Sequence, residues 1–202
     1  MKNFLVSLTC GLAFSLLLSF NTFATYCACC SEKGYYSISY GKPDSYHLDL
    51  LKAMKFGSKA NLYMDAGAED NIKGISTIAD NYDFTGAFAK PKWNFTFKTA
   101  DKSGTLTFPI PLKMINYKVD LHLEDNEESH GDPVLYKEWR FEGTTTSGTG
   151  IFQAGFAPMT KYFLVMQGRG NVCDNAEDFS HWRLEITGKK ASYAFFGKFD
   201  NK

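Results

Sequence analysis

Residues 92–98, KWNFTFK, alternate large aromatic side chains with polar ones. In an extended strand Trp93, Phe95 and Phe97 would share one face, and the polar residues between them would share the other. A period of two with one polar face is typical of an antiparallel sheet that buries one side. This stretch therefore predicts a mainly-β fold.

The same alternation recurs along most of the chain. Strands are predicted at residues 34–40, 60–65, 82–88, 92–98, 105–110, 116–123, 136–142, 162–167, 181–187 and 192–199. Glycine-containing turns are predicted at residues 101–104, 143–150 and 188–190, where glycine can adopt positive φ. We expect an antiparallel β-sandwich or barrel of about ten strands.

The predicted strand at residues 116–123 has one apolar and one polar face. In residues 116–123, the alternation puts Tyr117 and Val119 on the buried face and Lys118 on the solvent face together with Asp120.

Residues 44–57 fit a short helix near 45–56, with Asp44 or Ser45 as its N-cap and Gly57 closing it. A strand with alternating apolar residues is the other interpretation of this segment.

The three tryptophans suggest an internal repeat. Trp93, Trp139 and Trp182 are 46 and 43 residues apart, and each begins a W-x-[FL] pattern that runs into a polar turn. Regular spacing in this range is found in repeated β-architectures. An ordinary antiparallel meander with buried tryptophans would look the same, so both interpretations stay open.

The N-terminus has the pattern of a secretory signal. Lys2 precedes an apolar stretch over residues 4–20, and Ala24 fits the last residue before a cleavage site. An uncleaved anchor would need roughly 18–20 apolar residues, and this stretch is shorter and interrupted by hydroxyls. We expect residues 1–24 to be a cleaved signal peptide, and residues 25–202 to form a single β-rich domain with no transmembrane segment, secreted or periplasmic.

Composition and motifs argue against several functions. The chain has 22 basic and 22 acidic residues, so charge provides no reason to expect nucleic acid as a partner. It contains no nucleophile elbow, phosphate-binding loop, dinucleotide fingerprint or H-E-x-x-H motif. The sequence therefore favours a non-catalytic binding or envelope-associated protein.

Four cysteines remain after the signal peptide: Cys27, Cys29, Cys30 and Cys173. An exported chain with four cysteines favours disulfides, and three pairings are possible. Cys27–Cys30 with Cys29–Cys173 is preferred, because the other two need a C-x-C ring or a vicinal bridge.

Two other uses of the cysteines stay open. A lipid anchor requires a small residue before the modified cysteine, and Tyr26 precedes Cys27. A thiolate metal site or a redox centre is the third interpretation.

The loop over residues 170–182 is the candidate ligand or ion site. It contains Asp174, Glu177, Asp178 and His181, and Arg169 precedes it. Oxygen-rich loops hold Ca²⁺, and histidine with carboxylates holds other divalent metals. An exported metal-dependent hydrolase that uses this loop, with His130 or His181, is therefore an alternative function.

Two further features bear on partners. Residues 122–133 form a second acidic loop, and Tyr35, Tyr36 and Tyr63 could line a carbohydrate or apolar groove. The predicted partners are a small molecule, a glycan or a surface protein. No resident cofactor is expected unless an acidic loop binds Ca²⁺ or another divalent metal.

Overall fold

One antiparallel sheet runs through the computed structural model, which describes residues 36–64, 72–120, 135–145 and 147–201. The strands are β1 (Tyr36–Gly41), β2 (Phe56–Leu62), β3 (Asn81–Phe88), β4 (Lys92–Lys98), β5 (Ser103–Pro109), β6 (Lys113–Asp120), β7 (Leu135–Thr144), β8 (Ser147–Gly148), β9 (Lys161–Arg169), β10 (Phe179–Thr187) and β11 (Ser192–Phe199). The helices are α1 (Ser45–Ala53) and the short 3₁₀ segments η3 (Gly150–Gly155) and η4 (Ala176–Asp178). The mainly-β prediction is confirmed.

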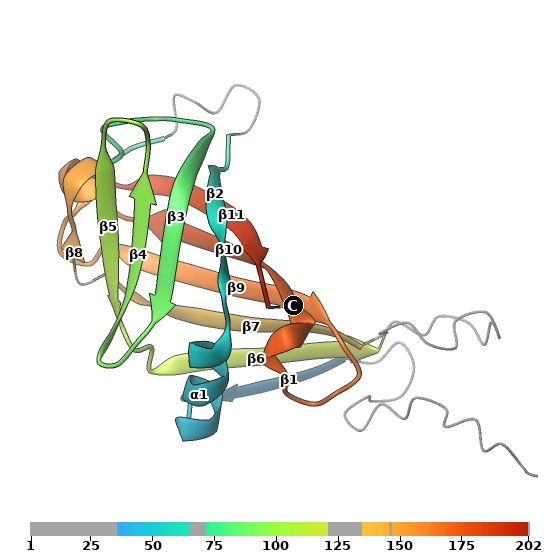
Figure 1. The fold of residues 1–202 in the computed structure, drawn as a ribbon. Coiled ribbons are helices and arrows are strands. Elements are labelled where there is room, and N and C mark those ends of the chain that lie inside the picture. Colours follow the sequence, from blue (N-terminus) through green and yellow to red (C-terminus); the bar gives the residue numbers. More distant parts are fainter. Residues whose placement is uncertain (1–35, 65–71, 121–134, 146, 202) are drawn as a thin grey trace, which may run out of the picture.

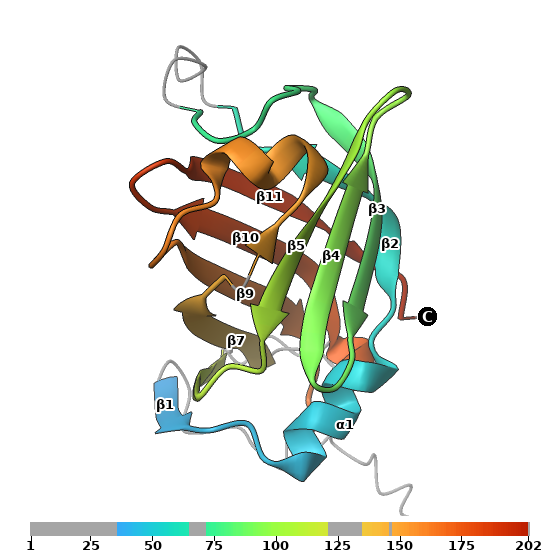
Figure 2. The ribbon, with the colours of Figure 1, turned by 90° about the vertical axis from the view of Figure 1, so that its left-hand side faces the viewer.

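The order of the strands makes the sheet curl on itself. The order is β1-β6-β7-β9-β10-β11-β2-β3-β4-β5-β8, so the early strand β2 pairs with the last strand β11. Strands β3 to β5 form one wall, which faces a second wall that includes β7, β9, β10 and β11 (Figures 1 and 2). Consecutive strands from β2 onward are usually neighbours, but β5 and β6 are not paired in the described sheet.

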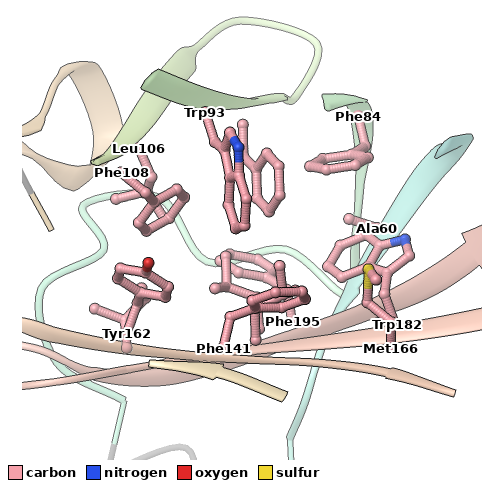
Figure 3. Packing of buried hydrophobic residues seen from close by; sticks show 14 of the residues in the cluster. Ala60, Phe84, Trp93, Leu106, Phe108, Phe141, Tyr162, Met166, Trp182 and Phe195 are labelled. Carbon is pink, nitrogen blue, oxygen red and sulfur yellow. The ribbon is translucent and has the colours of Figure 1, made fainter. Parts of the chain in front are cut away.

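Aromatic side chains fill the space between the walls. Trp93, Trp139 and Trp182 come from β4, β7 and β10, and each is at most 1% exposed. Figure 3 shows Trp93 from one wall above Phe141 and Tyr162 from the other. The three tryptophans of the W-x-[FL] pattern thus belong to one continuous sheet and share one core.

Helix α1 lies at one open end of the curled sheet (Figure 2). Asp44 is its N-cap and accepts a hydrogen bond from the backbone N–H of His47 at 2.9 Å, which confirms the helix interpretation. The expectation that Gly57 closes the helix was wrong. The helix ends at Ala53, and Gly57 is already inside β2, next to Phe56, which pairs with Phe199 of β11.

Strand β6 reverses the predicted orientation of its faces. Lys118 lies directly opposite Lys137 of β7, and opposed residues of an antiparallel pair project to the same face. That face also carries the buried Trp139, so Lys118 and Asp120 project inward, and Asp120 is only 5% exposed. The inward Lys118 contacts a loop that is distant in the sequence.

Candidate functional site

The predicted site loop was residues 170–182, but residues 179–182 already belong to β10. The remaining part, residues 170–178, packs at the same end of the sheet as α1 (Figure 1). At its start the backbone N–H of Gly170 donates to the carbonyl of Leu135 at 3.0 Å. At its end the side-chain amide of Asn201 donates to the carbonyl of Ala176 at 2.8 Å. The loop is therefore tied to β7 by a backbone hydrogen bond and to the C-terminal segment by a side-chain hydrogen bond.

A buried ion pair joins the loop to the inner face of the sheet. Lys137 of β7 is 1% exposed, and its ammonium group donates to the carboxylate of Asp178 and to the carbonyl of Val172. Burial lowers the pKa of Lys137, and the neighbouring Asp178 opposes that effect. A buried ammonium group needs such partners, so Asp178 has a structural task.

A second lysine makes parallel contacts one strand away. Lys118 of β6 donates to the carbonyl of Cys173 at 2.9 Å and lies 3.5 Å from the carboxylate of Asp174. The hydroxyl of Tyr46 in α1 also donates to the carbonyl of Asp174, at 3.3 Å. Two of the predicted ligand carboxylates are thus engaged by lysines of the sheet.

Four of the five predicted ligand residues meet around one hollow. Its volume is about 370 Å³, and its lining includes Arg169, Glu177, Asp178 and His181. Asp174 is not among the lining residues. Asn175 caps η4 and holds Asp178 through its side-chain amide at 3.1 Å, so part of this loop serves its own turn geometry.

A polar network on the outer face of the sheet borders this hollow and was not predicted. Glu138 of β7 is 7% exposed and accepts hydrogen bonds from Tyr136, Gln167 and Arg140. Burial pushes the pKa of Glu138 up, but these three donors outweigh burial and leave the pKa below its ordinary value. Burial and the adjacent Glu138 together raise the pKa of Tyr136.

The larger hollow lies at the seam, which we define as the boundary between β5 and β6 where consecutive strands do not pair. This seam pocket has a volume of about 700 Å³. Its lining is Pro109, Ile110, Pro111, Leu112, Lys113, Glu142, Gly143, Thr144, Lys161, Tyr162, Phe163 and Thr187. Most of its accessible lining is apolar.

The local sequence explains why the sheet opens at the seam. Pro109 is the last residue of β5, and Pro111 lies in the connection to β6. Neither proline has the N–H that a ladder needs, which disfavours continued regular pairing at this point of the chain. Gly143 allows the close packing of Tyr162 in the pocket lining, because a Cβ at residue 143 would lie only 2.8 Å from the ring of Tyr162. The two prolines therefore marked this break in the sequence, but the strand predictions did not take them into account.

Several predicted features lie outside the described residues: Cys27, Cys29, Cys30, the signal segment 1–24, Tyr35 and the acidic loop 122–133. Tyr36 and Tyr63, which are described, are 64% and 52% exposed. In the described part of the chain, no three His, Cys, Asp or Glu residues are grouped as metal ligands. No described helix is long and apolar enough to cross a membrane.

Comparison with known proteins identifies no family for this chain. A scan against protein-family models, a search of curated proteins and a search of solved structures each found no match to this chain. The function must therefore be argued from the sites themselves.

Proposed function

We propose that the protein is an exported, non-catalytic binding protein that holds the apolar body of an amphipathic small molecule in the seam pocket. The observation that carries the proposal is the pocket itself, about 700 Å³ with a mainly apolar lining. Ligand pockets typically have volumes of roughly 300–1,000 Å³ and are lined by apolar side chains with a few polar groups. Leu112 supports the proposal, because its side chain is 73% exposed at the pocket. Covering this apolar surface with a ligand would be energetically favourable.

The polar groups of the lining suggest how the ligand is oriented. Lys113 and Glu142 form an exposed ion pair at 3.0 Å, and Lys161 also lines the pocket. A ligand with an apolar body would cover Leu112 and Phe163, and its polar end would lie among these charged groups. An amphipathic molecule with one polar terminus is therefore the class that we propose.

Fluorescence titration with 1-anilinonaphthalene-8-sulfonate, an apolar probe with one anionic group, tests the proposal. The variants Leu112→Ser and Phe163→Ser shorten exposed side chains of the pocket, so the fold should be retained. Ile78→Ser is the matched control, because Ile78 is 51% exposed and does not line the pocket.

We expect each pocket variant to weaken probe binding by about threefold to tenfold, because covering one apolar side chain contributes roughly 1 kcal/mol or more. The control should bind like the unmodified protein. Equal binding by all three variants would show that the probe lies elsewhere and would overturn the pocket assignment.

Export and disulfide pairing belong to the same proposal. Tyr36, Val119, Tyr136 and Arg169 are in register across β1, β6, β7 and β9, which spans about 15 Å at roughly 4.8 Å per step. Cys173 follows four residues after Arg169.

The three cysteines at positions 27–30 precede Tyr36 by six to nine residues, a reach of about 20–30 Å. A bridge from this cluster to Cys173 is therefore compatible with the chain length. Intact mass measurement with thiol alkylation before and after reduction tests it. Thiols that react without reduction, or a mass that retains residues 1–24, would contradict this part of the proposal.

A further inference from the structure

Strand β1 is an edge strand without the usual protection. It pairs with β6 on one side through six consecutive residues, without a bulge. No other described strand pairs with its opposite side. Natural edge strands are normally shortened, bulged or marked with lysine or proline, because an open edge attracts another strand. Residues 36–41, YSISYG, contain none of these features.

The side chains that β1 presents on one face of the sheet are apolar or aromatic, and they are exposed. Tyr36, Ile38 and Tyr40 are 64%, 40% and 75% exposed. They share the outer face of the sheet, where Tyr36 stacks on Tyr117 with ring centroids 5.9 Å apart. Such a row on an unpaired edge indicates a contact surface rather than a solvated one.

The sequence of the edge is a palindrome. Residues 36–40 read YSISY in both directions, with Ile38 at the centre. If a second copy pairs antiparallel about Ile38, Tyr36 faces Tyr40 of the other copy, Ser37 faces Ser39, and Ile38 faces itself. Every pair is then chemically matched, and no charge opposes a like charge. Self-complementarity of this kind is what a two-fold interface requires.

We infer that β1 joins a second copy of this chain, edge to edge, in a two-fold symmetric dimer whose sheet continues from one subunit to the other. The inference is independent of the seam pocket, because no residue of β1 lines that pocket. A five-residue pairing is small, and interfaces well below about 1,000 Å² form weak complexes. The dimer is therefore concentration-dependent.

Analytical ultracentrifugation of the exported, oxidised protein, from micromolar to millimolar concentration, measures this equilibrium. The variants Ile38→Lys and Ile38→Glu each place like charges opposite one another at the two-fold axis, and each should be monomeric over the whole range. Ile38 is 40% exposed, so both variants should keep the fold, which circular dichroism checks. Ile78→Lys is the control for a charge on another exposed apolar residue, and it should dimerise like the unmodified protein.

The decisive experiment mixes the two variants. Because residue 38 faces residue 38 of the other copy, a mixture of Ile38→Lys and Ile38→Glu should form a heterodimer that neither variant forms alone. A monomeric unmodified protein at millimolar concentration would overturn the inference. Dimers that persist in both single variants would also overturn it, because the interface would then lie elsewhere.

Discussion

Removing the charge of Asp178 should destabilise the fold far more than removing the charge of an exposed aspartate. In Asp178→Asn, the ammonium group of Lys137 loses the carboxylate with which it forms an ion pair, while it stays buried. Breaking one side of a buried ion pair typically costs about 3–5 kcal/mol. Lys137 keeps its hydrogen bond to the carbonyl of Val172, so we expect about 3 kcal/mol, near the lower end.

For a chain of this size, about 3 kcal/mol corresponds to a fall in Tm of roughly 6–12 °C. Thermal unfolding followed by tryptophan fluorescence measures it, because Trp139 and Trp182 are buried in the core. The matched control is Asp83→Asn. Asp83 pairs with Lys59 at 2.6 Å, but both side chains are more than half exposed, so the Tm should not change measurably.

A second variant separates charge from shape. In the double variant Lys137→Met, Asp178→Asn, both charges of this ion pair are removed, and replacing a buried pair by neutral groups is often close to neutral. We therefore expect the double variant to recover most of the stability that the single variant loses. A double variant as unstable as Asp178→Asn would show that packing of the loop, rather than the lysine charge, sets the cost.

The pH dependence of Asp178→Asn provides a further check. Burial lowers the pKa of Lys137 in the folded protein, and loss of Asp178 lowers that pKa further. Between the folded and unfolded pKa values the unfolded state binds more protons, so stability rises with pH. The deficit of the variant should shrink as pH approaches the ordinary lysine value of 10.5. A deficit that is constant from neutral to alkaline pH, or no deficit relative to Asp83→Asn, would refute the reasoning.

Two other predictions concern the outer network and the seam. Hydrogen bonds lower the folded pKa of Glu138, so its contribution to stability is present above the ordinary value of 4.5 and is lost as pH falls through the lower, folded pKa. Acid unfolding of Glu138→Gln should therefore depend less on pH in that range, and an unchanged pH profile would contradict this. Gly143→Ala places a Cβ 2.8 Å from the buried ring of Tyr162, and should lower stability by about 1–3 kcal/mol in urea titrations. Unchanged stability would show that the ring shifts freely.

The alternation of apolar and polar residues predicted the strands of both walls well, because each wall buries one face of the sheet. The predicted bounds of β4 and β11 match the structure at every residue. Here the aromatic residues alternate strictly with polar ones, so local pattern and tertiary burial agree. The predicted position of β2 was displaced toward the C-terminus, because the strand begins at Phe56, which pairs with Phe199 in the last strand of the chain, and such a long-range partner leaves no local signal.

Strand β6 could not be oriented from its own residues. Tyr117 and Val119 look like a buried face, but they lie on the outer face beside Tyr36. Lys118 projects inward because its partners lie 55 residues away, in the loop after β9. Long-range ion pairs of this kind leave no periodic signal in the strand that they reorient. The seam pocket is similar, because its lining comes from separate segments of the chain.

The contacts around Cys173 bear on what a disulfide there would do. Lys137 binds the carbonyl of Val172, and Lys118 binds the carbonyl of Cys173 itself, so the backbone on both sides of the sulfur is held without a covalent bond. A bridge would then fasten the N-terminal segment to a loop that is already placed. Reduction should leave hydrogen-exchange protection within residues 170–178 largely intact, whereas Asp178→Asn should weaken that protection. If reduction lowers the protection of the loop and Asp178→Asn does not, then the disulfide, rather than the lysine contacts, holds the loop in place.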